Sequence, residues 1–326
     1  RIFAYLILVY IPVSTIASQS EPKAKHVAAE AQQQSAALTD DRQLAISNPF
    51  YITYRNQWYV ALDVVEQRSV LRVALPAQIV SGIPFAAASS EIRDIELRTG
   101  AEVRYGITDR ISGFVAGTYL ADRDTSTTSS GLFSSSSSSY PRTGLMNPHF
   151  GIYGRLLGTQ RNEWYIDVVG VYTPGIRSGD KSQVASPLSA LEAGLAAGRN
   201  MGGFTAGLGT AISYSPETNY NNYLYRATSA ITVEAITQYD FGIVFLNLHA
   251  GLHKYVDSVS NSDALNGKIR VIVNLEAGTK IGSNAFARIS YGWLLPVSAD
   301  YSSSGLNFVV EDKGGPAARL TVGARF

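Results

Sequence analysis

The sequence predicts an all-β protein, a closed antiparallel transmembrane β-barrel of about twelve strands. Three observations support this prediction. Of the 326 residues, 45% are hydrophobic and only 16% are charged, against about 25% charged in an average soluble domain. Beyond residue 17 there is no apolar run long enough to form a membrane-spanning helix. The apolar residues instead alternate with polar ones over long stretches, which is the period of a β-strand.

The N-terminus has the features of a secretory signal peptide. Arg1 is basic, an apolar stretch runs from Ile2 to Val13, and small residues around Ala17 form a cleavage site. We therefore expect residues 1–18 to be a signal peptide; the alternative is a buried helix or a single membrane anchor. Residues 19–45 are expected to form a mobile or partly helical periplasmic leader, or alternatively a coiled-coil or envelope-binding arm. The barrel is then expected over residues 46–326.

The chain contains no cysteine. This excludes disulfide bonds, thiol nucleophiles and cysteine-ligated metal. Together with the export signal, the composition indicates a protein of the bacterial envelope, and the strand pattern places it in the outer membrane.

Period-two alternation is clearest in residues 94–107, 268–281 and 318–326, where one set of alternate positions is apolar and the other carries most of the charge. Strands of soluble proteins cluster near five or six residues, whereas these stretches run to about 10 to 15, enough for a tilted strand to cross a bilayer. The alternation predicts twelve strands, at residues 68–80, 91–106, 111–121, 147–158, 163–174, 188–199, 203–214, 223–236, 240–255, 267–281, 285–297 and 316–326.

Short connectors alternate with longer ones along the chain. The short ones are at residues 106–110, 158–162, 198–202, 237–240 and 281–284. The longest polar loop runs from Asp122 to Met146 and includes the serines 134–139, so it is expected to be a solvated surface loop or, alternatively, a lid over the mouth. Outer-membrane barrels have short periplasmic turns and long extracellular loops. If the number of strands is even, the N-terminal and C-terminal ends of the barrel-forming chain lie on the same side of the membrane. With the short turns, that side is the periplasmic one.

The region from Ile46 to Gln67 is the weakest part of this assignment. Residues Gln57–Val65 have strand-like composition, and in the alternative interpretation they add a hairpin, which gives fourteen strands. Tyr and Trp lie near predicted strand ends, for example Tyr105, Trp164 and Tyr291, as the aromatic girdles of membrane proteins require.

Two elements carry a resemblance to known families. The final strand, Arg319-Leu-Thr-Val-Gly-Ala-Arg-Phe326, resembles the C-terminal strand of Gram-negative outer-membrane proteins. That resemblance implies that Phe326 is an assembly signal and that the barrel-assembly machinery is a partner. The stretch Arg104-Tyr-Gly-Ile-Thr-Asp-Arg-Ile111 is similar to one in uncharacterised transporter-like barrels, including those of the phenol-degradation (meta-pathway) type. Family membership would imply passage of small molecules.

No residue pattern supports an enzyme, a cofactor or a metal site. His249 and His253 are four residues apart, which on a strand separates them by about 13 Å, too far to share a zinc ion. We interpret them as polar residues of the lumen or rim. A barrel protease would need acids near a rim histidine, and His253 with Asp257 and Asp263 is the one candidate. With a net charge of +1 and no basic cluster, nucleic acid is not expected as a partner.

The charged residues on the non-lipid face are the candidate functional residues. Bases dominate this face of the last three predicted strands, whereas acids dominate the second, fifth and sixth. One hypothesis is a transverse field across the lumen that orients polar solutes. The alternative is that these charges pair with one another and fill a narrow lumen. The candidate pore-lining residues are Arg98, Glu102, Arg104, Arg155, Asp167, Glu192, Arg226, Glu234, Arg270, Glu276, Arg288 and Arg319.

The sequence therefore predicts an outer-membrane channel or facilitator for passive passage of small molecules through a charged lumen. Outer-membrane lipid and a small-molecule solute are the expected partners. The alternative is a structural or adhesive envelope barrel with a plugged lumen, and an outer-membrane hydrolase is a third, more distant class.

Overall fold

The computed structural model describes residues 44–130, 142–158, 163–176, 184–220, 223–225, 227–257, 265, 267–303 and 305–326. The predicted signal peptide, nearly all of the predicted leader and the serines 134–139 lie outside this part of the chain. Its strands are β1 (Trp58–Leu75), β2 (Gln78–Val80), β3 (Ile83–Phe85), β4 (Ala88–Gly106), β5 (Ile111–Ser130), β6 (Gly144–Leu145), β7 (His149–Leu157), β8 (Trp164–Thr173), β9 (Ala190–Met201), β10 (Phe204–Ser215), β11 (Thr218–Tyr220), β12 (Tyr223–Tyr225), β13 (Thr228–Asp240), β14 (Val244–Asp257), β15 (Ile269–Ile281), β16 (Ala285–Leu294), β17 (Val297–Ser303), β18 (Leu306–Asp312) and β19 (Gly315–Arg325).

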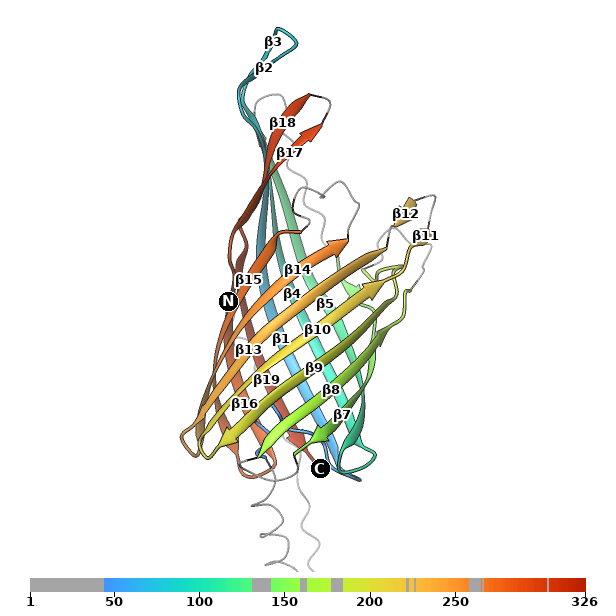
Figure 1. Cartoon of the computed structure of the whole chain (residues 1–326), viewed down its shortest axis with the longest axis vertical. Helices are drawn as coiled ribbons and strands as arrows, with labels where there is room; N and C mark the ends of the chain where they lie inside the picture. The colour runs from blue at the N-terminus through green and yellow to red at the C-terminus, as the bar shows by residue number, and fades with distance from the viewer. Residues whose placement is uncertain are drawn as a thin grey trace, which may run out of the picture. The chain divides into compact units, whose positions relative to one another are not determined.

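Twelve strands form a closed antiparallel barrel, as the sequence predicted (Figure 1). Around the wall the order is β1, β4, β5, β7, β8, β9, β10, β13, β14, β15, β16 and β19, and β19 returns to β1. Each strand except at this seam pairs with a barrel strand close to it in sequence. Closure satisfies the backbone amides that an open edge would leave exposed to lipid.

The seam joins the first and last strands of the barrel. β1 pairs with β19 from Tyr59 opposite Arg325 to Gln67 opposite Ala317, and pairs with β4 on its other side. At the end of the seam, the Trp58 amide donates to the Phe326 carbonyl at 3.0 Å and the Phe326 amide donates back to the Trp58 carbonyl at 2.9 Å. The seam is therefore continuous to its last residue.

The described short turns lie at one end of the barrel, which we call the turn end. The turn predicted at 237–240 falls at 241–243 instead, because β13 continues to Asp240, and residues 159–162 of the turn predicted at 158–162 lie outside the described residues. Backbone hydrogen bonds link neighbouring turns there: Asp240 donates to Gly203, Lys280 to Ile243 and Arg325 to Asn284. The C-terminal residue lies at the same end (Figure 1). The opposite end, with the longer connections, is the loop end. That the turn end faces the periplasm stays a prediction.

The outer face of the barrel is apolar. Leu208, Leu275 and Ile289 are 63%, 58% and 62% exposed, and they belong to a large set of exposed apolar side chains distributed around the wall. A contiguous apolar surface of this kind is unfavourable in water and fits contact with lipid.

Within the described ranges, no helix is both long and apolar enough to cross a membrane.

Three strands are much longer than a bilayer requires. β1, β4 and β5 have 18, 19 and 20 residues, about twice the 9 to 11 that a tilted strand needs. Beyond the barrel they continue past the loop end, where β18 pairs with the last part of β1 and β17 pairs with β18. We call this part, with the β2–β3 hairpin, the extension (Figure 1). Leu265, Ala299 and Val310 form a small hydrophobic cluster within it.

The structure corrects several predicted boundaries. The first strand covers 58–75 rather than 68–80, so Gln57–Val65 does not add a hairpin but forms the start of β1. The strand predicted at 223–236 begins at Thr228, after a separate β11–β12 hairpin. The predicted loop from Asp122 begins instead with strand, because β5 continues to Ser130 as part of the extension.

Close packing inside the barrel leads to a prediction at Gly278. A Cβ atom at this position would lie 2.2 Å from the Phe245 ring, which is fully buried. We expect Gly278→Ala to lower the free energy of unfolding by about 1–3 kcal/mol through overpacking, measured by urea denaturation in detergent. Gly117→Ala is the matched control, because no heavy atom lies within 4 Å of a Cβ built there. Equal stability of the two variants would contradict the expected crowding.

Candidate functional site

The inward face of the barrel carries the predicted candidate residues. Their register places them on the face that also holds buried Tyr59: for example, Arg104 lies opposite Tyr59 in the β1–β4 pair, and Arg155 lies opposite Asp167 in the β7–β8 pair. Arg226 lies outside the described residues. Whether the described candidates line a conducting pore stays a prediction; the contacts that they make are given below.

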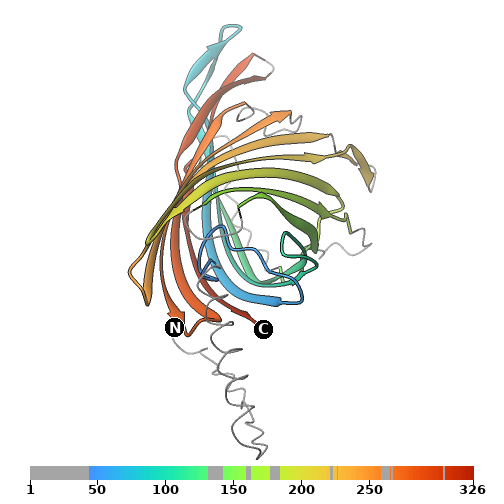
Figure 2. The ribbon, with the colours of Figure 1, turned by 60° about the horizontal axis from the view of Figure 1, so that its bottom comes forward.

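A segment that precedes β1 lies inside the barrel. We call residues 44–57 the inner segment, which crosses the lumen near the turn end (Figure 2). The Asn48 side-chain amide donates to Thr205 Oγ1 of β10 at 2.8 Å, and Asn48 Oδ1 accepts from the Phe50 amide at 2.9 Å. Where the segment leaves the lumen, the Asn56 amide donates to the Gly106 carbonyl at 2.9 Å.

Aromatic packing fixes the inner segment on one side of the lumen. The Phe50 ring stacks on Tyr165 of β8, with 6.2 Å between ring centroids. It also lies over Gly198 of β9 and Gly207 of β10, where a Cβ atom would come within 2.3 Å of the ring. Glycine at these two positions is what lets the ring approach the wall.

A second apolar cluster fixes the other side. Ile46 and Tyr51 of the inner segment pack with Tyr59, Phe245 and Phe286 on the inward face of β1, β14 and β16. Burial raises the pKa of the Tyr51 phenol, so that it stays neutral within this cluster. The inner segment is therefore held on opposite walls of the lumen near the turn end.

Arg155 joins the inner segment to the wall. Its side chain is only 2% exposed and forms a bidentate ion pair with Asp167, at 2.8 Å from Nε to Oδ1 and 3.0 Å from Nη2 to Oδ2. Nη2 also donates to the Phe50 carbonyl. The guanidinium carbon lies 4.7 Å from the centroid of the Tyr165 ring. One buried cation therefore binds a wall carboxylate, an aromatic ring and the backbone of the inner segment.

Most of the predicted lumen charges form local ion pairs. Each base pairs with an acid on its own strand or on a nearby one, which matches the alternative of mutually paired charges. Little net charge is left for a field across the lumen. The pairs are Arg98–Glu96, Arg104–Glu102, Arg155–Asp167, Arg270–Asp312, Lys280–Asp240, Arg288–Glu276 and Arg319–Asp63.

Glu276 is the centre of a polar network on β14–β16. Its carboxylate accepts hydrogen bonds from the side-chain amides of Asn247 at 2.9 Å and Asn274 at 3.0 Å, and from Arg288 Nη1 at 3.2 Å. His249 Nε2 lies 3.8 Å from the same carboxylate. Three hydrogen-bond donors thus stabilise one buried acid, which fixes the side chains of this wall.

His253 lies on the inward face, where its Nδ1 forms a 2.9 Å hydrogen bond with Thr232 Oγ1. Of the acids considered with it, Asp263 lies outside the described residues. No group of three or more metal-ligating side chains occurs in the described part of the chain.

Cavities occupy the lumen above the inner segment. The deepest has a volume of about 300 Å³ and rests on Pro49, Phe50, Tyr51 and Ile52. A second, of about 520 Å³, shares Thr232 and Glu234 with the first. A third, of about 470 Å³, shares Gln67, Ser69 and Leu294 with the second and reaches Tyr255 and Leu265 at the loop end. Neighbouring cavities thus follow one another in the lumen between the loop end and the inner segment.

Sequence reasoning did not find the inner segment. The signal available was a run of buried-type residues, Leu44, Ile46, Phe50 and Ile52, that precedes the first strand without its alternation.

Solved structures of outer-membrane barrels resemble this fold. An outer membrane channel from Pseudomonas putida F1 matches with a TM-score of 0.53 and 10% identity, covering 86% of this chain and all of the other. The translocator domain of the autotransporter NalP from Neisseria meningitidis matches with a TM-score of 0.45 and 12% identity, over 93% and 98% of the two chains. A Pseudomonas aeruginosa FadL homologue matches with a TM-score of 0.44 and 11% identity, over 82% and 90%.

No protein-family model and no curated protein matches the sequence. At 10% identity, the likeness to the channel from Pseudomonas putida F1 shows the fold alone, a closed antiparallel β-barrel of the kind found in outer-membrane proteins.

Proposed function

We propose that the protein is an outer-membrane channel for small molecules, closed at rest by its inner segment. The observation that carries this proposal is the series of cavities in the lumen, each sharing lining residues with the next, from the loop end down to Phe50. A barrel that serves only as a membrane anchor has no need of a hollow interior, and small barrels of that kind fill theirs with side chains.

The residues that line the cavities favour small solutes with both polar and apolar groups. Apolar side chains such as Ile236, Ile272 and Leu294 alternate around the cavities with polar ones, and most charges are paired. The resemblance of residues 104–111 to barrels of the phenol-degradation type adds small aromatic molecules to the candidate solutes. Passage is proposed to be passive, because the driving force for uptake through such a pore is the solute gradient alone.

The remaining parts of the proposal concern how the chain reaches and contacts the membrane. Lipid contacts the apolar outer face, and export by the signal peptide followed by insertion through the barrel-assembly machinery, with Phe326 as its signal, would bring the chain to the outer membrane.

Liposome swelling tests the channel. Proteoliposomes with the full chain are expected to swell in solutions of small neutral solutes, faster than protein-free liposomes and more slowly as the solute size increases. Heat-modifiable gel mobility checks that the barrel is folded in the same preparation. A folded barrel that gives no swelling, and no conductance in a planar bilayer either, would contradict the proposal.

A second candidate is a structural or adhesive role, and the extension favours it. β1, β4, β5, β17 and β18 form a sheet beyond the loop end that transport does not require. A chain without residues 297–312 would separate the two candidates: a channel keeps its swelling rate, whereas an adhesive barrel loses binding of whole cells to a surface.

A further inference from the structure

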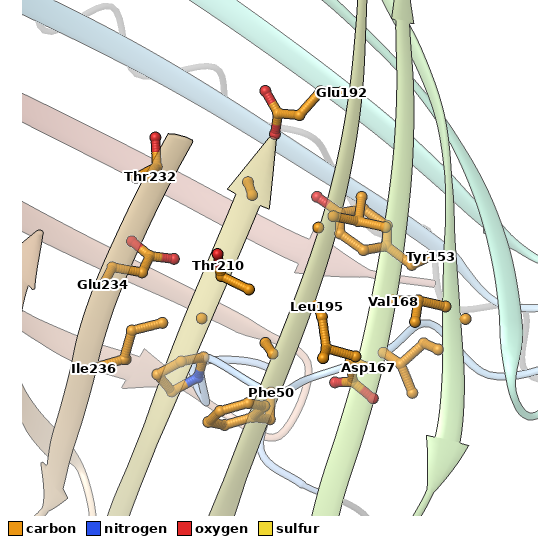
Figure 3. Close-up of a pocket in the computed structure, with 18 of the residues that line it drawn as sticks. Phe50, Tyr153, Asp167, Val168, Glu192, Leu195, Thr210, Thr232, Glu234 and Ile236 are labelled. Carbon is orange, nitrogen blue, oxygen red and sulfur yellow. The ribbon is translucent and has the colours of Figure 1, made fainter. Parts of the chain in front are cut away.

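The deepest cavity of the lumen has the form of a binding site. Its floor is the inner segment from Pro49 to Ile52, and its volume of about 300 Å³ is at the lower end of the range for small-molecule sites. One wall consists of the small residues Gly194, Ala196, Gly209 and Ala211 of β9 and β10, which keep the space open. Phe50 and Ile236 supply apolar surface at its lower part (Figure 3).

Two carboxylates line this cavity without a partner among the described residues. The side chains of Glu192 and Glu234 form no ion pair or hydrogen bond there, whereas those of Asp167 and Glu102 are paired with Arg155 and Arg104. The acids come from different strands, Glu192 from β9 and Glu234 from β13, and both are seen at the cavity in Figure 3.

The nearby base does not cancel their charge. Arg104 Nε donates to Glu102 Oε1 at 3.0 Å, and the guanidinium carbon lies 4.2 Å from the centroid of the Tyr153 ring and 5.0 Å from that of Tyr59. Arg104 is therefore already neutralised and stacked. Among the described residues that line the cavity, the uncompensated charge is negative.

The register separates the two carboxylates from the apolar floor. Glu234 lies opposite Gly209, which lies opposite Ala196, and Glu192 is four residues, or about 13 Å, farther toward the loop end. The two acids thus lie at different depths: Glu234 is only two residues above the level of Gly207, which Phe50 covers, and Glu192 is nearer the loop end. A ligand that fits has a cationic end toward the mouth and an apolar body toward the inner segment.

We infer that this cavity binds a small organic ammonium ion with an apolar body of about one ring. Glu234, the deeper carboxylate, attracts the ammonium group in a partly enclosed site where water screens the charge less, and Glu192 attracts it on entry from the loop end. The ring contacts Phe50 and Ile236. A neutral ligand of the same shape lacks the first contribution, and an anion is repelled. This site would select cations among the solutes of the proposed channel, and in that sense it rests on the proposed function.

Binding to the detergent-solubilised full chain tests the inference. The probes are benzylammonium and benzyl alcohol, which have similar shape and differ in charge, with affinity measured by calorimetry at low salt. Benzylammonium is expected to bind roughly fivefold more tightly, as one partly exposed charge interaction of up to about 1 kcal/mol allows. In Glu192→Gln/Glu234→Gln the preference is expected to disappear, while Glu311→Gln in the extension leaves it unchanged. Equal affinity of the wild type for the two probes overturns the inference, whether or not the variants fold.

The same probes keep this inference distinct from the channel proposal. Binding in detergent does not depend on passage. Swelling without a preference for benzylammonium would contradict the cation site and leave the channel in place. A preference without swelling would contradict the channel and leave the site in place.

Discussion

Removing the inner segment from the lumen is expected to raise single-channel conductance on the order of tenfold, because a twelve-stranded barrel is wide enough to hold water once its interior is vacated. The change we propose replaces residues 46–53 with a Gly-Ser linker of equal length and keeps the hydrogen bonds of Asn56 at the turn end. Planar-bilayer recording of the wild type and the variant is the measurement.

A matched replacement serves as the control for this experiment. The same kind of linker in place of residues 78–85, the β2–β3 hairpin of the extension, is expected to leave conductance unchanged. A third variant tests whether the inner segment moves. Because the natural chain has no cysteine, two introduced cysteines can form only one disulfide bond. Asn48→Cys/Thr205→Cys joins two side chains that touch at 2.8 Å, and a current that appears only after reduction would identify movement of the inner segment as the opening step. A linker variant that conducts like the wild type would refute the inner segment as the barrier.

Replacing Arg155 by alanine is expected to cost about 3–5 kcal/mol of stability, the usual result of leaving one member of a buried ion pair without its partner. The loss includes the bidentate pair with Asp167 and the bond to the Phe50 carbonyl. Guanidinium unfolding in detergent, followed by tryptophan fluorescence, measures it.

Two further variants make this prediction specific. Arg199→Ala removes an arginine whose guanidinium carbon lies 5.7 Å from the exposed Trp164 ring on the outer face, and is expected to cost about 1 kcal/mol or less. Asp167→Ala in addition to Arg155→Ala is expected to destabilise by less than the sum of the two single changes, because the pair is lost only once. An Arg155→Ala variant as stable as Arg199→Ala would show that the junction contributes little.

Strands with one lipid face and one polar face could be predicted from the sequence, and the start of β1 could not. In β15, apolar Val273, Leu275 and Ala277 alternate with polar Asn274 and Glu276, so the period is clear. At the start of β1, Tyr59 and Ala61 face inward and are apolar too, because they pack against the inner segment. Both faces of the strand are then apolar, and the alternation that marks a membrane strand disappears.

The candidate site was predictable in its residues but not in its contacts. Glu102 and Arg104 are two apart on one strand, so their pair can be inferred from the period alone. The pair of Arg155 with Asp167 depends on the β7–β8 register, and its contact with Phe50 depends on a segment more than a hundred residues away. The unpaired state of Glu192 and Glu234 becomes visible only once every other partner is assigned.

The seam between β1 and β19 has a consequence for the order of folding. Until β19 is in place, β1 and β16 both present rows of unpaired amides that cannot face lipid, and pairing the first strand with the last is the least local contact in the wall. Closure is therefore expected to be a late and cooperative event. The inner segment leads directly into β1 and packs on β14 and β16 as well, so its final enclosure waits for the same event. Completion of the wall and closing of the lumen are then one kinetic step.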